Sequence, residues 1–216
     1  RLLAICNDYK LPVLEDAAEA LGAKYKGQYA GTLGDIGCFS FNGNKIMSTG
    51  GGGMIVSHNS EHLKRAKHLT TTAKRDSLTY FHDEVGYNYR LVNVLAALGV
   101  AQLEQLDSFI ASKIDTARYY RDNLKGVGDI GFQRVQDGVE SNEWLFTITT
   151  SSMQRLLDHL NANGVMSRPF WIPMNQLPMY SNNLYINQSD MSARVHRTAL
   201  SIPCSTNILE SDLEKV

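Results

Sequence analysis

Short apolar runs bounded by turn residues fill the first quarter of the chain. Leu11–Asp16, Ile36–Phe41 and Gly53–Ser57 each predict a strand, because they are brief, apolar and flanked by Gly, Pro or Asn. A shorter strand is expected at Ala23–Tyr25, and a helical turn at Ala17–Leu21. The alternation of short strands with helices favours an α/β architecture.

Helices are expected where apolar residues recur at three- and four-residue spacing. These stretches are Arg1–Tyr9, Glu61–Leu69, Val92–Leu106, Ile110–Leu124, Met153–Leu160, Ser192–Leu200 and a start at Glu210. Val92–Leu106 is expected to be amphipathic, since Leu95 and Leu98 share a face with Ala101. The polar stretch Thr70–Tyr89 predicts irregular backbone.

The second half of the chain has its own pattern. Trp144–Thr150 alternates as a strand does, Arg168–Pro173 predicts a stiff extended loop because of its prolines, and Ile202 begins an exit loop. A boundary near Asp107 therefore predicts two domains, residues 1–106 and 107–216. The chain has no initiator Met, and it stops inside a helix start, so we expect a fragment cut at both ends.

Composition and charge argue against some classes of function. The net charge is −1 without blocks of like charge, which argues against a nucleic-acid footprint or a membrane-surface patch. The cysteines Cys6, Cys38 and Cys204 are odd in number and far apart, which indicates free thiols in a reducing compartment. No stretch approaches membrane-spanning length and no signal peptide is visible, so we expect a cytoplasmic protein.

The turn that presents Lys45 carries the most chemistry. Asp16 and Ser40 stand at the ends of two predicted strands, where open α/β sheets bind ligands, and Lys45 follows Ser40 closely. Pyridoxal phosphate needs an amine for its aldehyde, a carboxylate for its ring nitrogen and donors for its phosphate, and these three residues supply one each. Spacing alone leaves open a solvated surface lysine, because any strand can end in Asp or Ser.

Two further motifs have alternative interpretations. Gly50–Gly53 is either a phosphate cradle or a turn that allows close backbone approach; it lacks the Lys-Ser/Thr of a P-loop and precedes no helix. His82–Glu84 resembles a metal cluster, but consecutive residues do not converge on one ion and no second ligand set follows. We therefore expect no metal site.

Several motifs together resemble the DegT/DnrJ-type (StrS-like) sugar aminotransferases. The motifs span the whole chain in order: Glu15–Ala23, Gly31–Gly37, Ser40–Lys45, Gly51–Met54, His82–Arg90, Ala96–Leu103, Ser167–Pro169 with Trp171 and Pro173, and Leu200–Pro203. The sequence Phe-Asn-Gly-Asn-Lys at 41–45 looks most like that of members that make 4-amino-6-deoxy sugars for bacterial surface polysaccharides.

The resemblance implies the aspartate aminotransferase fold, fold type I of the pyridoxal phosphate enzymes. Residues 1–106 would be part of the cofactor-binding large domain, and 107–216 a small α+β domain. The family places a phosphate-binding loop and an aromatic that stacks on the cofactor ring before the point where this sequence begins. We expect the cofactor site encoded here to be incomplete.

The resemblance also implies individual roles. Lys45 binds the cofactor as an aldimine and then moves a proton between substrate and cofactor. Asp16 pairs with the pyridinium nitrogen, since an opposite charge favours the protonated ring. Ser40 contacts the phosphate, and Asn88 does so from the neighbouring subunit of a homodimer. Glu19 stands where many relatives have Gln, which leaves open whether it touches the cofactor.

The implied reaction moves an amino group, in ping-pong fashion, from an amino acid such as glutamate to a nucleotide-linked keto sugar. Arg90, Arg168 and Trp171 are candidate substrate contacts, although Trp171 fits core packing equally well. The alternatives are a non-catalytic regulator or scaffold of the same fold and a pyridoxal phosphate-dependent sugar dehydratase. Some relatives with dehydratase activity carry His in place of the lysine, so Lys45 argues against that branch.

Overall fold

The computed structural model describes residues 1–76 and 78–216, which form two compact units. The first unit holds Arg1–Ile110 together with Gln136–Trp144, and the second holds Ala111–Val135 together with Leu145–Val216. The sequence did not indicate the return of Gln136–Trp144 to the first unit. The division into functional domains 1–106 and 107–216 stays a prediction.

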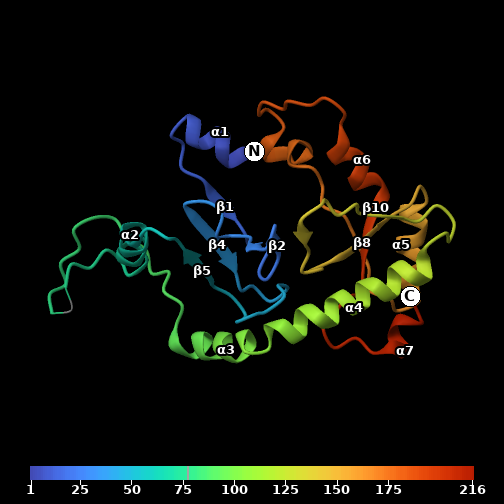
Figure 1. Cartoon of the computed structure of the whole chain (residues 1–216), viewed down its shortest axis with the longest axis horizontal. Coiled ribbons are helices and arrows are strands. Elements are labelled where there is room, and N and C mark those ends of the chain that lie inside the picture. The colour runs from blue at the N-terminus through green and yellow to red at the C-terminus, as the bar shows by residue number, and fades with distance from the viewer. Residues whose placement is uncertain (77) are drawn as a thin grey trace. The chain divides into compact units, whose positions relative to one another are not determined.

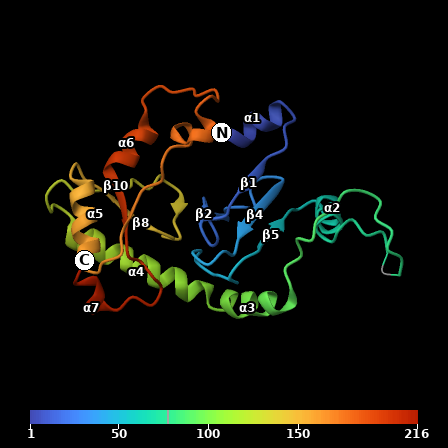
Figure 2. The same ribbon diagram turned by 180° about the vertical axis from the view of Figure 1, so that it is seen from behind.

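The first unit is built around a small mixed sheet. Its elements are α1 (Leu2–Asp8), β1 (Leu14–Asp16), β2 (Lys24–Tyr25), β3 (Gln28–Tyr29), β4 (Ile36–Ser40), β5 (Gly53–Val56), α2 (Ser60–Thr70), α3 (Asn93–Leu103), the start of α4 (Leu106–Leu124) and β7 (Val139–Glu140). β4 lies between β1 and β5, as Figures 1 and 2 show from opposite sides. β1 and β4 run parallel, whereas β4 and β5 are antiparallel.

Most strands and helices predicted for this unit are confirmed, but β3 and β7 were not predicted, and the segment before β2 differs from the expected helical turn. Ala17–Leu21 forms two successive turns, in which Ala20 N–H donates to Ala17 O (3.0 Å) and Ala23 N–H to Ala20 O (2.9 Å). So short a run cannot offset the cost of starting an α-helix. Gly22 then takes φ +80°, a left-handed conformation that glycine adopts without strain.

Helix α3 is not amphipathic, so that expectation is wrong. Apolar residues occupy its whole circumference, and none of its residues is buried. Val94 is 79% exposed, Val100 58% and Leu98 47%. The heptad-like spacing of leucines identified the helix, but Val and Ala on the opposite face remove the polar side that amphipathicity requires.

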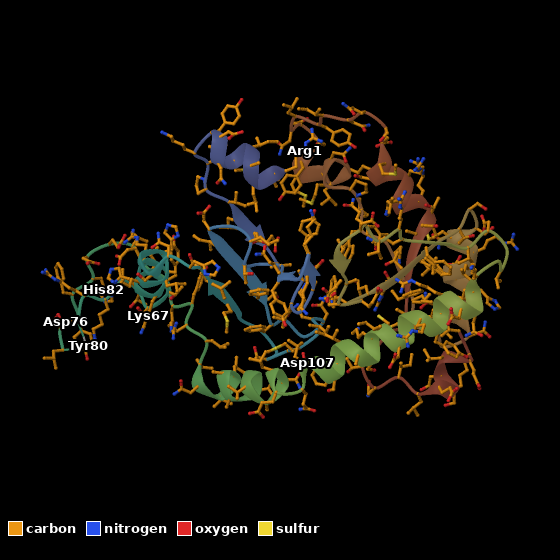
Figure 3. All side chains as sticks on the ribbon, in the orientation of Figure 1. Arg1, Lys67, Asp76, Tyr80, His82 and Asp107 are labelled. Carbon is orange, nitrogen blue, oxygen red and sulfur yellow. The ribbon has the colours of Figure 1, made fainter. Side chains whose placement is uncertain are left out.

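The segment between α2 and α3 is irregular where it is described, as expected; position 77 lies outside the described residues. Figure 3 labels Asp76, Tyr80 and His82 on this segment, beyond Lys67 of α2. Tyr87 N–H donates to Leu69 O (2.7 Å), which ties the end of the segment back to α2.

The second unit is an antiparallel sheet packed with helices. Its elements are the rest of α4, β6 (Gly131–Phe132), β8 (Phe146–Thr149), α5 (Met153–Ala162), β9 (Arg168–Pro169), 3-10 turns at Met174–Gln176 and Pro178–Tyr180, α6 (Met191–Thr198), β10 (Ala199–Ile202) and α7 (Glu210–Leu213). The strand order is β6-β8-β10-β9. Ser192–Leu200 was predicted as one helix followed by a loop, but the helix ends at Thr198 and β10 follows.

The core of the second unit joins α4, α5 and the sheet. Tyr120, Ile148 and Leu200 are almost fully buried there. The hydroxyl of Tyr120 donates to Pro203 O (2.7 Å), and burial raises the pKa of this phenol. The Lys113 ammonium, also buried, donates to Cys204 O (2.6 Å), so the polar groups inside this core have partners.

Within the described residues, no single helix is both long and apolar enough to cross a membrane. Helices α3 and α4 meet the length and composition criteria only together, as a bent pair.

The stability of the second unit should vary with pH because of Asp129. Hydrogen bonds from Ser151 and Thr150 lower its pKa from 3.8 to about 2. A depressed carboxyl pKa stabilises the fold above the unfolded pKa and stops doing so as the pH falls through the folded value. We expect Asp129→Asn to lower the urea midpoint at pH 6, and the difference from wild type to shrink between pH 4 and pH 2. Asp122→Asn, an exposed carboxylate on α4, is the control; an equal difference at pH 6 and pH 2 would contradict the assignment.

Candidate active site

The parallel pairing of β1 and β4 brings two candidate residues to one edge of the sheet. Asp16, the last residue of β1, is in register with Cys38, and Ser40 ends β4 two residues further on. The chain leaves β1 through a hydrogen bond from Ala17 N–H to Cys38 O (2.9 Å). The carboxyl ends of parallel strands are the common ligand-binding edge of α/β sheets.

Asp16 and Ser40 both offer polar side chains at this edge. The Asp16 carboxylate is exposed, and its Oδ1 accepts Ala18 N–H at 3.1 Å, which fixes its orientation across the following turn. The Ser40 hydroxyl, partly buried, accepts Asn42 N–H at 3.3 Å. An ionised carboxylate and a hydroxyl are suited to a protonated ring nitrogen and to a phosphate, respectively.

The loop after β4 is closed by backbone hydrogen bonds at its base. Phe41 N–H donates to Gly52 O (3.0 Å) and Thr49 N–H to Phe41 O (3.0 Å). Phe41, Ile46 and Met47 are buried, so apolar residues anchor the loop on either side of Lys45. Lys45 N–H donates to Asn42 O (3.1 Å), which makes a tight turn just before the lysine side chain.

The Lys45 amine is held by two groups. Its Nζ lies 3.1 Å from Glu19 Oε1 and 4.5 Å from the centre of the Trp144 ring, over its face. Only 12% of the Lys45 side chain is exposed, against 51% for Glu19. The solvated surface lysine that spacing alone left open does not describe this environment.

The glycine run after Lys45 behaves as a turn. Gly50 and Gly52 have φ values of +79° and +88°, and a Cβ on Gly53 would lie 2.3 Å from Phe39 O. Gly50 N–H donates to the Ser48 hydroxyl (2.9 Å), and Gly52 supplies the carbonyl that closes the loop. This geometry supports the interpretation of close backbone approach over that of a phosphate cradle.

Other candidate residues are not brought to Lys45. Asn88 and Arg90 are exposed on the segment that follows Tyr87, and Asn88 forms an isolated bridge with Thr71. Within the described part of the first unit, no hydrogen bond or ion pair joins either of them to Asp16, Ser40 or Lys45.

Arg168 and Trp171 belong to the second unit. Arg168 is on β9, with its guanidinium 3.7 Å from Met166 Sδ. Trp171 is 56% exposed, meets Phe170 edge to face at 5.1 Å, and helps to line a largely apolar groove of about 940 Å³. It therefore lines a surface groove, and its contact with a substrate stays a prediction.

Asp83 and Glu84 meet a residue that the sequence argument overlooked. His68 of α2 lies 2.7 Å from Asp83 Oδ1 and 3.4 Å from Glu84 Oε1, and the three groups lie within 4.8 Å of one another. Arg65 contacts both Glu84 oxygens, and this hydrogen bonding lowers the pKa of Glu84. The argument that consecutive residues do not converge is therefore wrong for Asp83 and Glu84. The Arg65 guanidinium already neutralises the Glu84 carboxylate, and the expectation of no metal site stays a prediction. The network ties the irregular segment to α2.

Three residues of the first unit that sequence reasoning missed shape the site. The Glu15 carboxylate accepts three backbone N–H groups, from Gly31 (2.8 Å), Leu33 (2.6 Å) and Gly34 (2.6 Å). Asn142 and Trp144 contact the Glu19 turn and the Lys45 loop. The glycines at 31 and 34 indicated a turn whose backbone N–H groups need a hydrogen-bond acceptor. No local pattern marks Asn142 or Trp144.

Comparison with known proteins gives the family. The sequence profile of the DegT/DnrJ/EryC1/StrS aminotransferase family matches residues 1–216. The chain is 38% identical over 184 residues to GDP-perosamine synthase of Escherichia coli O157:H7, covering 84% of the chain and 50% of that protein. It is 32% identical over 217 residues to GDP-perosamine synthase of Vibrio cholerae, covering 98% of the chain and 59% of that protein. The chain thus spans little more than half the length of these relatives.

A solved structure gives the fold. The structure of S. venezuelae DesV in complex with a ketimine intermediate superposes with a TM-score of 0.92 at 27% identity, covering 99% of this chain and 58% of that one. Helicobacter pylori PseC, an aminotransferase involved in the biosynthesis of pseudoaminic acid, has the same fold with a TM-score of 0.89 at 22% identity. The predicted α/β fold of the aspartate aminotransferase type is confirmed.

Glu15 should order the loop at 31–34. Hydrogen bonds to a charged group contribute about 1.5–3 kcal/mol each, and bonds that share one carboxylate add incompletely. We expect Glu15→Ala to destabilise the first unit by about 2–4 kcal/mol and to speed hydrogen exchange at the amides of Gly31, Leu33 and Gly34. Glu61→Ala, which removes an exposed carboxylate of α2, should leave these amides unchanged. Equal exchange in wild type and Glu15→Ala would refute the role of the carboxylate.

Proposed function

The chain belongs to the DegT/DnrJ/EryC1/StrS aminotransferase family, and we propose that it carries the lysine-bearing part of a pyridoxal phosphate site. The reaction we propose transfers an amino group from an amino acid, glutamate being the expected donor, to a nucleotide-linked keto sugar. The observation that carries this proposal is the sequestered Lys45 amine beside an edge where Asp16 and Ser40 offer a carboxylate and a hydroxyl.

The residues present fit the cofactor in their chemistry. Bound pyridoxal phosphate would supply an electron sink for the carbon that loses its proton. The Asp16 carboxylate would keep the ring nitrogen protonated, because an adjacent negative charge favours the charged form. The Ser40 hydroxyl would donate to a phosphate oxygen. Both side chains are tethered by backbone N–H groups that leave further lone pairs available.

Lys45 has the surroundings that proton transfer requires. Its amine is largely shielded from water, and the Glu19 carboxylate at 3.1 Å can accept and return a proton. We therefore assign Lys45 the proton transfer at the substrate carbon. Glu19 holds the amine when Lys45 is not bonded to the cofactor, which gives the departure from Gln at this position a function.

We further propose that the active form is a homodimer and that Asn88 of one copy contacts the cofactor phosphate of the other. Asn88 is exposed and not joined to the Lys45 loop of its own chain in the described structure. The neighbouring helix α3 exposes Val94, Leu98 and Val100. An exposed apolar surface of this kind is typical of a subunit contact.

The names of the relatives support the substrate class that we propose. Two of them are named GDP-perosamine synthase, and another, of Campylobacter jejuni, is named as a transaminase of a UDP-linked dideoxy amino sugar. We propose a nucleotide-linked 4-keto-6-deoxy sugar as acceptor, used for surface polysaccharides, with Arg90, Arg168 and Trp171 as substrate contacts. Cys6, Cys38 and Cys204 form no disulfide among the described residues, which suits the reducing cytoplasm that we propose for the enzyme.

One assay separates this proposal from its alternatives. The protein as it is encoded is incubated with pyridoxal phosphate, glutamate and a GDP- or UDP-linked 4-keto-6-deoxy sugar, and both 2-oxoglutarate and amino sugar are measured. We expect equimolar products, and at least a thousandfold loss of rate in Lys45→Ala. Lys125→Ala, an exposed lysine beyond α4, is the matched control and should keep the wild-type rate.

The other outcomes each contradict the proposal in a distinct way. Loss of a sugar hydroxyl without 2-oxoglutarate would indicate a dehydratase. No turnover with any of these sugars, together with no cofactor binding, would indicate a non-catalytic protein of this fold. Full activity of Lys45→Ala would remove the lysine from the mechanism.

A further inference from the structure

The segment Gln136–Trp144 belongs to the first unit although it follows α4 and β6. β7 within it pairs antiparallel with β2, with Lys24 opposite Glu140 and Tyr25 opposite Val139. The Lys24 ammonium also lies 3.5 Å from the Glu140 carboxylate. The pairing carries the chain back to the turns that follow β1.

Trp144, the last residue of this segment, contacts the lysine loop in two ways. Its indole Nε1–H donates to Asn44 O at 2.6 Å, which holds the backbone one residue before Lys45. Its ring face lies 4.5 Å from Lys45 Nζ, within the range of a cation–π contact. Trp144 is 9% exposed, so these contacts are made largely out of water.

Asn142 holds the turn that carries Glu19, the other group in contact with the Lys45 amine. Its Nδ2 donates to Glu19 O (2.9 Å) and Leu21 O (3.0 Å), and its Oδ1 accepts Trp144 N–H (3.1 Å). The side chain is 6% exposed, and every polar atom of its amide is used. One short segment thus fixes both the turn that carries Glu19 and the indole that covers Lys45.

We propose that Trp144 is a positioning residue for Lys45. Its ring face and the Glu19 carboxylate bind the Lys45 ammonium when no cofactor is present. Its indole N–H fixes the loop from which the lysine projects. This inference rests on the proposed function, since it concerns the resting state of the lysine that we assign to the cofactor. The alternative is that Trp144 only fills space, in which case its loss changes stability but not the chemistry of the Lys45 amine.

The reactivity of Lys45 in cofactor-free protein separates these roles. Trace labelling with acetic anhydride, measured by mass spectrometry, gives the extent of acetylation of Lys45 relative to that of Lys125 in the same sample. A cation–π contact of this kind corresponds to about a twofold to thirtyfold change in the equilibrium between the Lys45 side chain held over the ring and the side chain released to the reagent. We expect Trp144→Leu to raise Lys45 labelling by such a factor, and Trp144→Phe, which keeps a ring face, to stay within about twofold of wild type. Trp171→Leu, the other tryptophan, is the control and should change nothing at Lys45.

A second measurement leaves Trp144 in place, in case Trp144→Leu does not fold. Trp171→Phe leaves Trp144 as the one tryptophan of the chain. In that background Lys45→Met removes the cation from the ring face and should change the Trp144 emission, whereas Lys125→Met should not. Unchanged Lys45 labelling in Trp144→Leu, equal effects of Trp171→Leu, or unchanged emission in Lys45→Met would each overturn the inference. None of these results depends on turnover, so wild type that fails to bind cofactor would count against the proposed function alone.

Discussion

Strand β1 runs parallel to β4 with Asp16 opposite Cys38, and the positions of Asp16 and Ser40 follow from that pairing. The register brings the end of β1 and the end of β4 to one edge of the sheet. Close packing preserves it: a Cβ on Gly37 would lie 1.9 Å from Gly31 O, and the Glu15 carboxylate binds the loop that begins at Gly31. A shift of one residue would turn the Asp16 carboxylate to the opposite face.

The position of the Lys45 amine depends on contacts from two segments that lie far apart in the sequence. Glu19 comes from the turns after β1, and Trp144 from a segment that returns after α4 and β6. Both groups attract the Lys45 ammonium, one by its charge and the other by its π-electrons. For the role that we propose, Lys45 must leave these contacts when it reacts. The protein's own side chains hold the amine in the structure.

The sequence predicted the parts of this account that are local. Short apolar runs gave β1, β4 and β5, and three- and four-residue spacing gave α2 and α5, because periodicity reports which residues face a core. The motif around Lys45 gave the family, and the fold followed from it. Wrong expectations arose where spacing has no unique meaning: Leu95 and Leu98 marked α3 as a helix, but they did not reveal that its other face is apolar too. Trp144 lies 100 residues from Asn44, and Asn142 lies 123 residues from Glu19, so no local pattern connects them.

The proposed role of Lys45 is tested most directly by covalent trapping of pyridoxal phosphate on the protein. The protein as it is encoded is mixed with pyridoxal phosphate, reduced with borohydride, digested and mapped by mass spectrometry. We expect a single pyridoxyl group on the peptide that carries Lys45, with no label on that peptide when the residue is changed to Ala. Stoichiometric label on another lysine, with Lys45 unmodified, would contradict it.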